Sequence, residues 1–191
     1  MTRMPTVEES TLSPAQRRVW DEIVNGPRGE VAGPLKVWLQ SAELADRAQA
    51  LGAFARYGTS LPPHLSELAI LITARLWSAE FEWNQHAPIA LAAGIPPEVI
   101  DAIGQAEVPV LSDPQQAAVR DVAIALQRDR CVSDGVYRAA LKALGQQGLV
   151  ELVGILGYYG LISMTINAFE VPQDPGPPLP PLLIAAEQMF R

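Results

Sequence analysis

The stretch ELAILITARLWSAEFEWNQHAPIALAAGIPPEVIDAI, residues 67–103, carries helical apolar patterns separated by a short break at WSAE. One helix is expected from about His64 to Trp77 and a second from about Glu80 to Ala93, where Gly94 is a typical left-handed cap. The motif PPEVIDAI predicts a short helix after that turn. The break at WSAE is short enough for the first two helices to fold back side by side, so this stretch predicts a helical core.

The rest of the chain continues the same pattern. Strand-like alternation and turns at hairpin spacing are not evident in the sequence, which favours an all-α, multi-helix bundle. Further helices are expected from Pro14 to about Val24, through the apolar positions 37–55, from Asp113-Pro114 to Leu126, from Ser133 to about Leu144, and from about Leu149 to Phe169.

Residues 14–171 are predicted to form a single domain, since 191 residues are enough to bury a sizeable core. Residues 1–13 resemble a mobile N-terminal arm. Residues 172–191 begin VPQDPGPPLPPLL and form a Pro-rich strap, stiff in polyproline geometry. Two interpretations of the strap stay open: a disordered tail, or a segment that packs on a neighbouring subunit.

Composition narrows the class of partner. Hydrophobic residues make up 49% of the chain and charged residues 18%, which predicts either a homo-oligomer or a monomer with a large core. The net charge is −7 and basic runs are absent, so nucleic acid and anionic membranes are poor partners. The N-terminus lacks the apolar segment of a signal peptide, and polar residues interrupt the most apolar stretch before it reaches the ~20 residues of a membrane span. A cytoplasmic protein is therefore expected.

Polar chemistry gathers in EFEWNQHAPIAL, residues 80–91. Glu82 and His86 are four residues apart, and Ile89 and Ala90 continue their helix face, so the pair is expected on the buried side. Burial raises a carboxyl pKa and a neighbouring carboxylate raises a His pKa, which suits general acid/base chemistry near neutral pH. The alternatives are a Glu–His pair that only satisfies itself in the core, or a metal site. A metal site is disfavoured, because His64 is the only other His and the sequence has no cluster of Cys ligands.

Other residues are candidates for the same site. Glu67, near the start of the apolar helix, would approach His86 if the two helices fold back, although a favourable interaction with the helix dipole also explains it. Arg75 is a candidate for holding a substrate carboxylate, or else extends to solvent or forms a subunit salt bridge. Trp83 and Tyr158 are candidates for the wall of a substrate pocket, with a core position as the alternative for Trp83. Tyr159 and Asn167 lie on the same late helix as Tyr158, but Asn167 is expected on the face opposite Tyr158.

The spacing Glu67-x11-Ala79-x2-Glu82-x3-His86 resembles the E-x11-C-x2-C-x3-H signature of the alkylhydroperoxidase D / carboxymuconolactone decarboxylase superfamily. The similarity extends from about Pro34 to Val171. It implies an all-helical, alkylhydroperoxidase D-like fold that assembles into trimers or hexamers.

The chain departs from that signature at both cysteine positions, which hold Ala79 and Glu82. Neither can form a thiolate, and the only cysteine, Cys131, lies outside the motif, so thiol peroxidase activity is not expected. The remaining set of Glu67, Glu82 and His86 resembles the decarboxylase branch. There, loss of CO2 leaves an enolate-like intermediate that must be protonated, with no metal or organic cofactor required.

The sequence therefore predicts a carboxy-lyase that acts by acid/base chemistry on a small carboxylated lactone or oxo acid. The alternative is a non-catalytic helical protein that binds a small acid or a partner protein. A residual hydroperoxidase activity is the third and weakest hypothesis.

Overall fold

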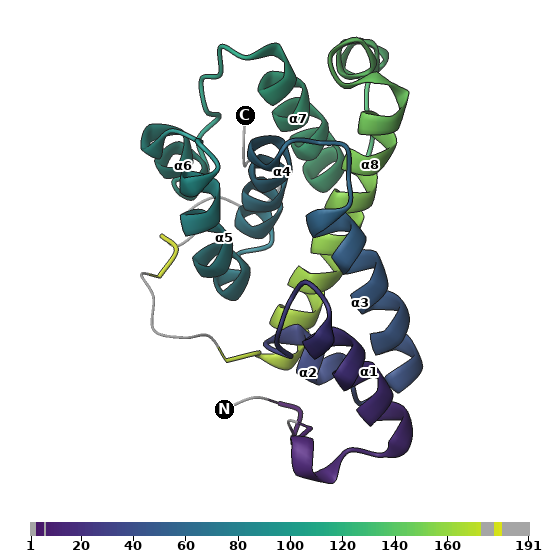
Figure 1. Cartoon of the computed structure of the whole chain (residues 1–191). Helices are drawn as coiled ribbons and strands as arrows, with labels where there is room; N and C mark the ends of the chain where they lie inside the picture. Colours follow the sequence, from purple (N-terminus) through teal and green to yellow (C-terminus); the bar gives the residue numbers. More distant parts are fainter. Residues whose placement is uncertain (1–2, 6, 173–177, 181–191) are drawn as a thin grey trace.

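A computed structural model describes residues 3–5, 7–172 and 178–180, and these ranges contain helices but no strands (Figure 1). The elements are η1 (Glu9–Thr11), α1 (Pro14–Asn25), α2 (Pro34–Trp38), α3 (Ala42–Tyr57), α4 (Pro63–Leu76), α5 (Glu80–Ala92), α6 (Pro97–Gly104), α7 (Pro114–Ile124), η2 (Ala125–Asp129) and α8 (Asp134–Phe169). The prediction of an all-α fold is confirmed.

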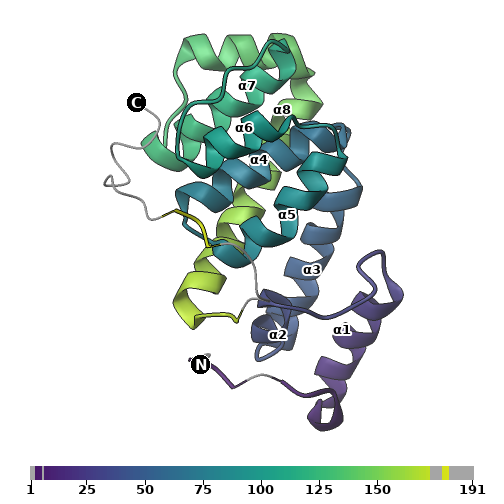
Figure 2. The same ribbon diagram turned by 90° about the vertical axis from the view of Figure 1, so that its left-hand side faces the viewer.

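Helix α4 is the centre of the molecule. Every residue from Leu65 to Arg75 is buried, as expected for a helix that is apolar on nearly all sides. It packs against α5, α6, α7 and α8, which surround it in both views (Figures 1 and 2). The predicted helical hairpin forms as well, because α4 ends at Leu76 and α5 starts at Glu80 beside it.

Helix α8 contains a break that the sequence anticipates. Gly145 has φ +71°, outside helical geometry, so the element consists of a first part capped by Ser133 and a second, more apolar part. Helix α8 as a whole contacts α3, α4 and α7. Among the described residues, α8 is the one helix long and apolar enough to span a membrane, but 61% of its most apolar window is buried inside the protein. Helix α8 therefore has the burial of a core helix.

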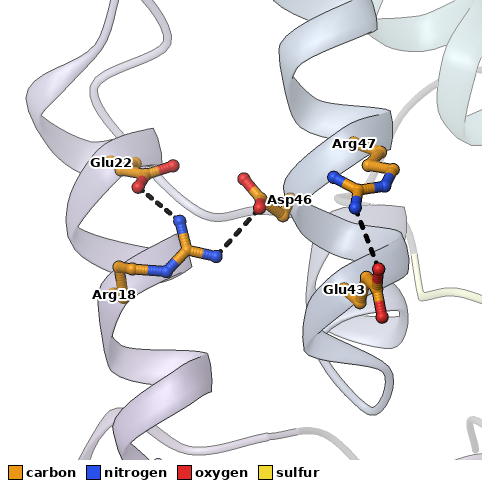
Figure 3. A network of polar contacts seen from close by, with 5 residues as sticks. All are labelled: Arg18, Glu22, Glu43, Asp46 and Arg47. Atoms are coloured by element: carbon orange, nitrogen blue, oxygen red, sulfur yellow. Dashed lines mark hydrogen bonds and ion pairs between the residues drawn. The ribbon is translucent and has the colours of Figure 1, made fainter.

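Helices α1 and α2 lie at one end of the molecule, and α3 runs from that end along α8 (Figures 1 and 2). A capping box between Ser13 and Gln16 starts α1. Across the surface, Arg18 on α1 contacts Glu22 on its own helix and Asp46 on α3, at 2.6 and 2.8 Å, while Arg47 pairs with Glu43 (Figure 3). This network joins the exposed faces of α1 and α3.

The predicted terminal segments have contacts in their described parts. Arg3 forms an ion pair with Glu170 at the end of α8, and Val7 is buried in the hydrophobic core. In the C-terminal strap, residues 173–177 and 181–191 lie outside the described residues. Leu179 is buried, and the carbonyl of Pro180 accepts a hydrogen bond of 3.0 Å from Arg75. The mobility of the arm and the packing of the strap on a second subunit stay predictions.

Candidate functional site

The hairpin of α4 and α5 brings Glu67, Glu82 and His86 into direct contact. The Nδ1 atom of His86 lies 2.7 Å from Oε2 of Glu67, and its Nε2 atom lies 2.8 Å from Oε1 of Glu82. All three residues are buried, with exposures of 5% or less. The i, i+4 spacing on α5 positions Glu82, whereas Glu67 reaches the ring across the hairpin from α4.

This arrangement stabilises the protonated imidazole. Burial lowers the pKa of His86, but the charges and hydrogen bonds of Glu82 and Glu67 outweigh burial and raise that pKa from 6.5 to about 9. At neutral pH, His86 is therefore an imidazolium that donates one hydrogen bond to each carboxylate. The three residues form a buried store of one proton, with Glu82 and His86 facing a cavity.

The cavity has a volume of about 290 Å³ and lies between α2, α3, α5, α8 and the connector that follows α1. Its lining includes Glu82 and His86 from α5, and Tyr158, Tyr159 and Ile162 from α8. Phe81 closes one side by packing on Gly33, where an added Cβ would lie 2.4 Å from the Phe81 ring. Gly33 also has φ +52°, so glycine meets two requirements at this position.

Tyr159 and Tyr158 form an aromatic wall beside the histidine. The Tyr159 ring meets His86 edge to face at a centroid distance of 5.2 Å, and Tyr158 meets Tyr159 at 5.3 Å. Burial raises the pKa of Tyr159 well above its usual range, and the charge of Glu82 raises it further. Burial also raises the pKa of Tyr158, to about 12, against the lowering effect of Arg28. Both phenols therefore stay protonated at physiological pH.

Basic side chains line the more exposed part of the same cavity. Arg28 comes from the connector after α1, Lys36 from α2 and Arg56 from α3, and each is half-buried. Arg28 donates a hydrogen bond of 3.0 Å to the hydroxyl of Tyr158. The cavity thus has a buried end with Glu82 and His86 and a more exposed end with positive charge.

The predicted substrate-binding residues occupy different positions. Tyr158 lines the cavity. Trp83 is buried and packs on Gly104. Arg75 is buried where it contacts Pro180, and this burial lowers the pKa of its guanidinium. Neither residue lines the cavity. The side chain of Asn167 instead donates to the carbonyl of Trp77 at 2.7 Å.

Sequence reasoning did not select Arg28, Lys36 and Arg56 for the site. Arg28 lies in NGPRGEVAGP, residues 25–34, a stretch that predicts only a turn-rich connector. A charged side chain beside glycines in a connector is a weak signal for a site, because the fold decides where such a segment lies. Lys36 and Arg56 lie on helices, and the apolar patterns of these helices do not show which polar residues face a cavity.

Carboxylates occupy both sides of the His86 ring. Both ring nitrogens are within hydrogen-bond distance of carboxylate oxygens, and no group of three or more His, Cys, Asp or Glu side chains in the described ranges is arranged to hold a metal ion. Ala79 is fully buried at the start of α5, and Cys131 is exposed after η2.

Residues 42–123 match the model of the Carboxymuconolactone decarboxylase family. This range runs from the start of α3 to the last turn of α7 and contains Glu67, Glu82 and His86. Over these residues the chain is similar to that family. No curated protein matches the sequence significantly.

Two solved structures have a similar fold. An uncharacterized peroxidase-related protein from Silicibacter sp. TM1040 is 12% identical, with a TM-score of 0.72 over 91% of this chain and 92% of that chain. The apo debrominase Bmp8 is also 12% identical, with a TM-score of 0.70 over 88% of this chain and 90% of that chain. At this identity the similarity establishes the fold and leaves the reaction open.

Proposed function

We propose that this protein is a cofactor-free carboxy-lyase of the carboxymuconolactone decarboxylase type, which acts on a small carboxylated lactone or oxo acid. The observation that carries the proposal is the buried Glu67–His86–Glu82 set, which holds a proton at the inner end of a cavity of about 290 Å³. A decarboxylation needs such a group, because the carbanion left after loss of CO2 must be protonated.

The proposed reaction begins when the carbon–carbon bond to the carboxylate breaks. Its electron pair moves into the adjacent carbonyl system as an enolate, and CO2 leaves. Glu82 then delivers a proton to the enolate carbon after receiving it from Nε2 of His86, 2.8 Å away. Glu67 keeps the imidazole oriented through Nδ1, and solvent restores the proton. In this scheme Glu82 is the catalytic residue, His86 supplies its proton and Glu67 is a positioning residue.

The rival proposal is a non-catalytic protein that binds small acids in the same cavity. One observation favours it: both ring nitrogens of His86 already have partners, so the set is complete without a substrate. In that case the polar set is a satisfied core network, and the cavity binds acids without converting them.

The deciding experiment is a screen of the purified protein against carboxylated lactones and β-oxo acids, with release of CO2 as the readout. We expect turnover of at least one compound. We also expect His86→Ala to lower that turnover by about 10²–10⁴-fold, the usual effect of losing a general acid/base. Titration of His86 by NMR with the same acids provides a second readout.

An acid that shifts the His86 titration without releasing CO2 would favour the binding protein. Turnover by His86→Ala at the wild-type rate would exclude the proposed mechanism.

A further inference from the structure

The Arg28–Tyr158 contact is closely packed and leaves little space around it. Tyr158 is 2% exposed, and its hydroxyl accepts the hydrogen bond from Arg28 at 3.0 Å. Gly52 on α3 makes room for this contact, because a Cβ there would lie 2.1 Å from the Tyr158 hydroxyl oxygen and 2.5 Å from an Arg28 nitrogen. The absence of a side chain at Gly52 thus permits the contact between Arg28 and Tyr158.

Tyr158 does not neutralise Arg28. A phenol that stays protonated accepts a hydrogen bond from the guanidinium but leaves its positive charge in place. The Nε atom of Arg28 is buried and has no hydrogen-bond partner, and no carboxylate forms an ion pair with Arg28 among the described residues. A half-buried cation in this position is stabilised by an anion.

Further positive charge surrounds the same end of the cavity. Arg56 and Lys36 line it together with Arg28, and the charge of Arg56 acts on both phenols. Glu30 also lines the cavity and supplies opposing charge, but its side chain is exposed to solvent. The half-buried charged side chains at this end are therefore cationic, whereas the carboxylate of Glu82 lies at the buried end of the cavity.

We infer that Arg28, held in place by Tyr158, binds a carboxylate of the ligand, with Arg56 and Lys36 supplying further positive charge. The identity of the ligand class, a small carboxylated lactone or oxo acid, rests on the proposed function. Arg28 and Arg56 are specificity-determining residues in this account: they select anionic ligands and orient them in the cavity that contains Glu82 and His86.

Binding of paraconate, a γ-lactone with one carboxylate, to the full-length protein tests this inference by calorimetry. The carboxylate of paraconate is too far from the lactone carbonyl to be lost as CO2, so the ligand binds without reacting. We expect the uncharged methyl ester to bind at least about 10-fold more weakly, since hydrogen bonds to charged groups contribute most to such affinity.

The variants distinguish a specific carboxylate-binding site from general attraction of anions by the positive charge of the protein. Arg28→Met and Arg56→Met are expected to weaken paraconate binding by about 10–100-fold each. Arg47→Met is the matched control on α3, because Arg47 pairs with Glu43 on the surface; it should bind like wild type. Tyr158→Phe should weaken paraconate binding less than Arg28→Met does. The double variant should have the same affinity for paraconate as Arg28→Met, because Tyr158 acts through Arg28. Thermal unfolding checks that each variant is folded. If Arg28→Met does not fold, the affinity of Arg56→Met for paraconate decides the test.

Three results would overturn the inference: no paraconate binding by the wild type, equal affinity for paraconate and its ester, or wild-type affinity in both folded arginine variants. Glu82→Gln separates this inference from the proposed function, since it should abolish most turnover without weakening paraconate binding. Arginine-dependent binding by a protein that releases no CO2 from any acid would preserve the inference and reject the lyase.

Discussion

His86 is the residue on which the site depends, and its state of protonation decides what the site is able to do. With a pKa of about 9, the imidazole keeps its proton throughout the physiological range. Loss of Glu67 removes one of the interactions that raise this pKa. We predict that Glu67→Gln lowers the midpoint of the His86 titration, measured by NMR, and moves the alkaline limb of the pH–activity profile to lower pH. An unchanged midpoint would contradict the contact between Glu67 and His86.

The same pKa predicts how stability depends on pH. The pKa of His86 is higher in the folded protein than in the unfolded chain, so the folded state binds the proton more tightly. The resulting stabilisation is fully present below about pH 6.5 and is lost as the pH rises towards about 9. We expect the free energy of unfolding of the wild type, measured with denaturant, to decline over this pH range. The free energy of unfolding of His86→Gln should lack this decline. Parallel curves for the two proteins would refute the prediction.

Gly52 offers a test of the Arg28–Tyr158 contact at a position outside the Glu67–His86–Glu82 set. A Cβ at Gly52 would overlap the Tyr158 hydroxyl, so Gly52→Ala should lower the free energy of unfolding by about 1–3 kcal/mol, the usual cost of overpacking. It should also weaken paraconate binding. Gly157→Ala is the control: nothing lies within 4 Å of its Cβ position, and alanine is expected to stabilise this exposed helical site by about 0.5–1 kcal/mol. Equal stability of the two variants would contradict the close approach at Gly52.

At the residue scale, the sequence predicts contacts within a helix better than contacts across the cavity. The pair Glu82–His86 follows from helical spacing, and the short break between helices makes Glu67 a plausible third member. Arg28 does not follow from any such rule, because its position depends on how the 25–34 connector lies against α8.

At the scale of elements, a buried hydrogen bond ties α2 to α8. The indole nitrogen of Trp38 donates to the hydroxyl oxygen of Thr165 at 2.8 Å, and Trp38 also packs edge to face on Tyr158. Thr165→Val keeps the side-chain shape but leaves the indole N–H without an acceptor. We predict a loss of about 1–3 kcal/mol in the free energy of unfolding, measured with denaturant.

The control for this variant is Arg18→Met, which removes the Arg18–Asp46 ion pair between α1 and α3 and the Arg18–Glu22 pair within α1 (Figure 3). Exposed pairs are screened by salt and contribute little, so its unfolding midpoint should stay close to wild type, above all in high salt. A Thr165→Val protein as stable as Arg18→Met would show that the Trp38 hydrogen bond contributes nothing.

Most elements follow from local signals. Pro14 after Ser13, Pro114 after Asp113 and Gly94 after α5 mark helix ends that the structure shows at or near those positions. Two details are not visible in the pattern. The apolar run through residues 37–55 divides into α2 and α3, and the helix after Pro114 passes into the π-helical turn η2, because tertiary packing decides where helical geometry changes.

At the scale of the whole molecule, apolar surface stays exposed on α3 and α8. A groove lined by Leu51, Phe54 and Val150 has a volume of about 550 Å³, and Val150 is 73% exposed. We propose that the protein is a homo-oligomer, with a trimer or hexamer favoured by the family resemblance. Light scattering on the full-length chain should therefore give a mass above that of the monomer, and a monomer at micromolar concentration would contradict this.

The Pro-rich strap is tested by the same method on a chain that ends at Val171. We predict that shortening weakens the assembly. The same mass with and without the strap would exclude a necessary role for residues 172–191.

In the proposed reaction, Glu82 is recharged by His86 and protonates the enolate left after decarboxylation. The decisive measurement of this role is the rate of CO2 release by Glu82→Gln, relative to wild type, on the best substrate from the screen. The amide keeps the size of the carboxyl group but cannot carry the proton. We predict that the rate falls by about 10²–10⁴-fold while thermal unfolding shows a folded protein; a folded Glu82→Gln protein that releases CO2 at the wild-type rate would contradict the account.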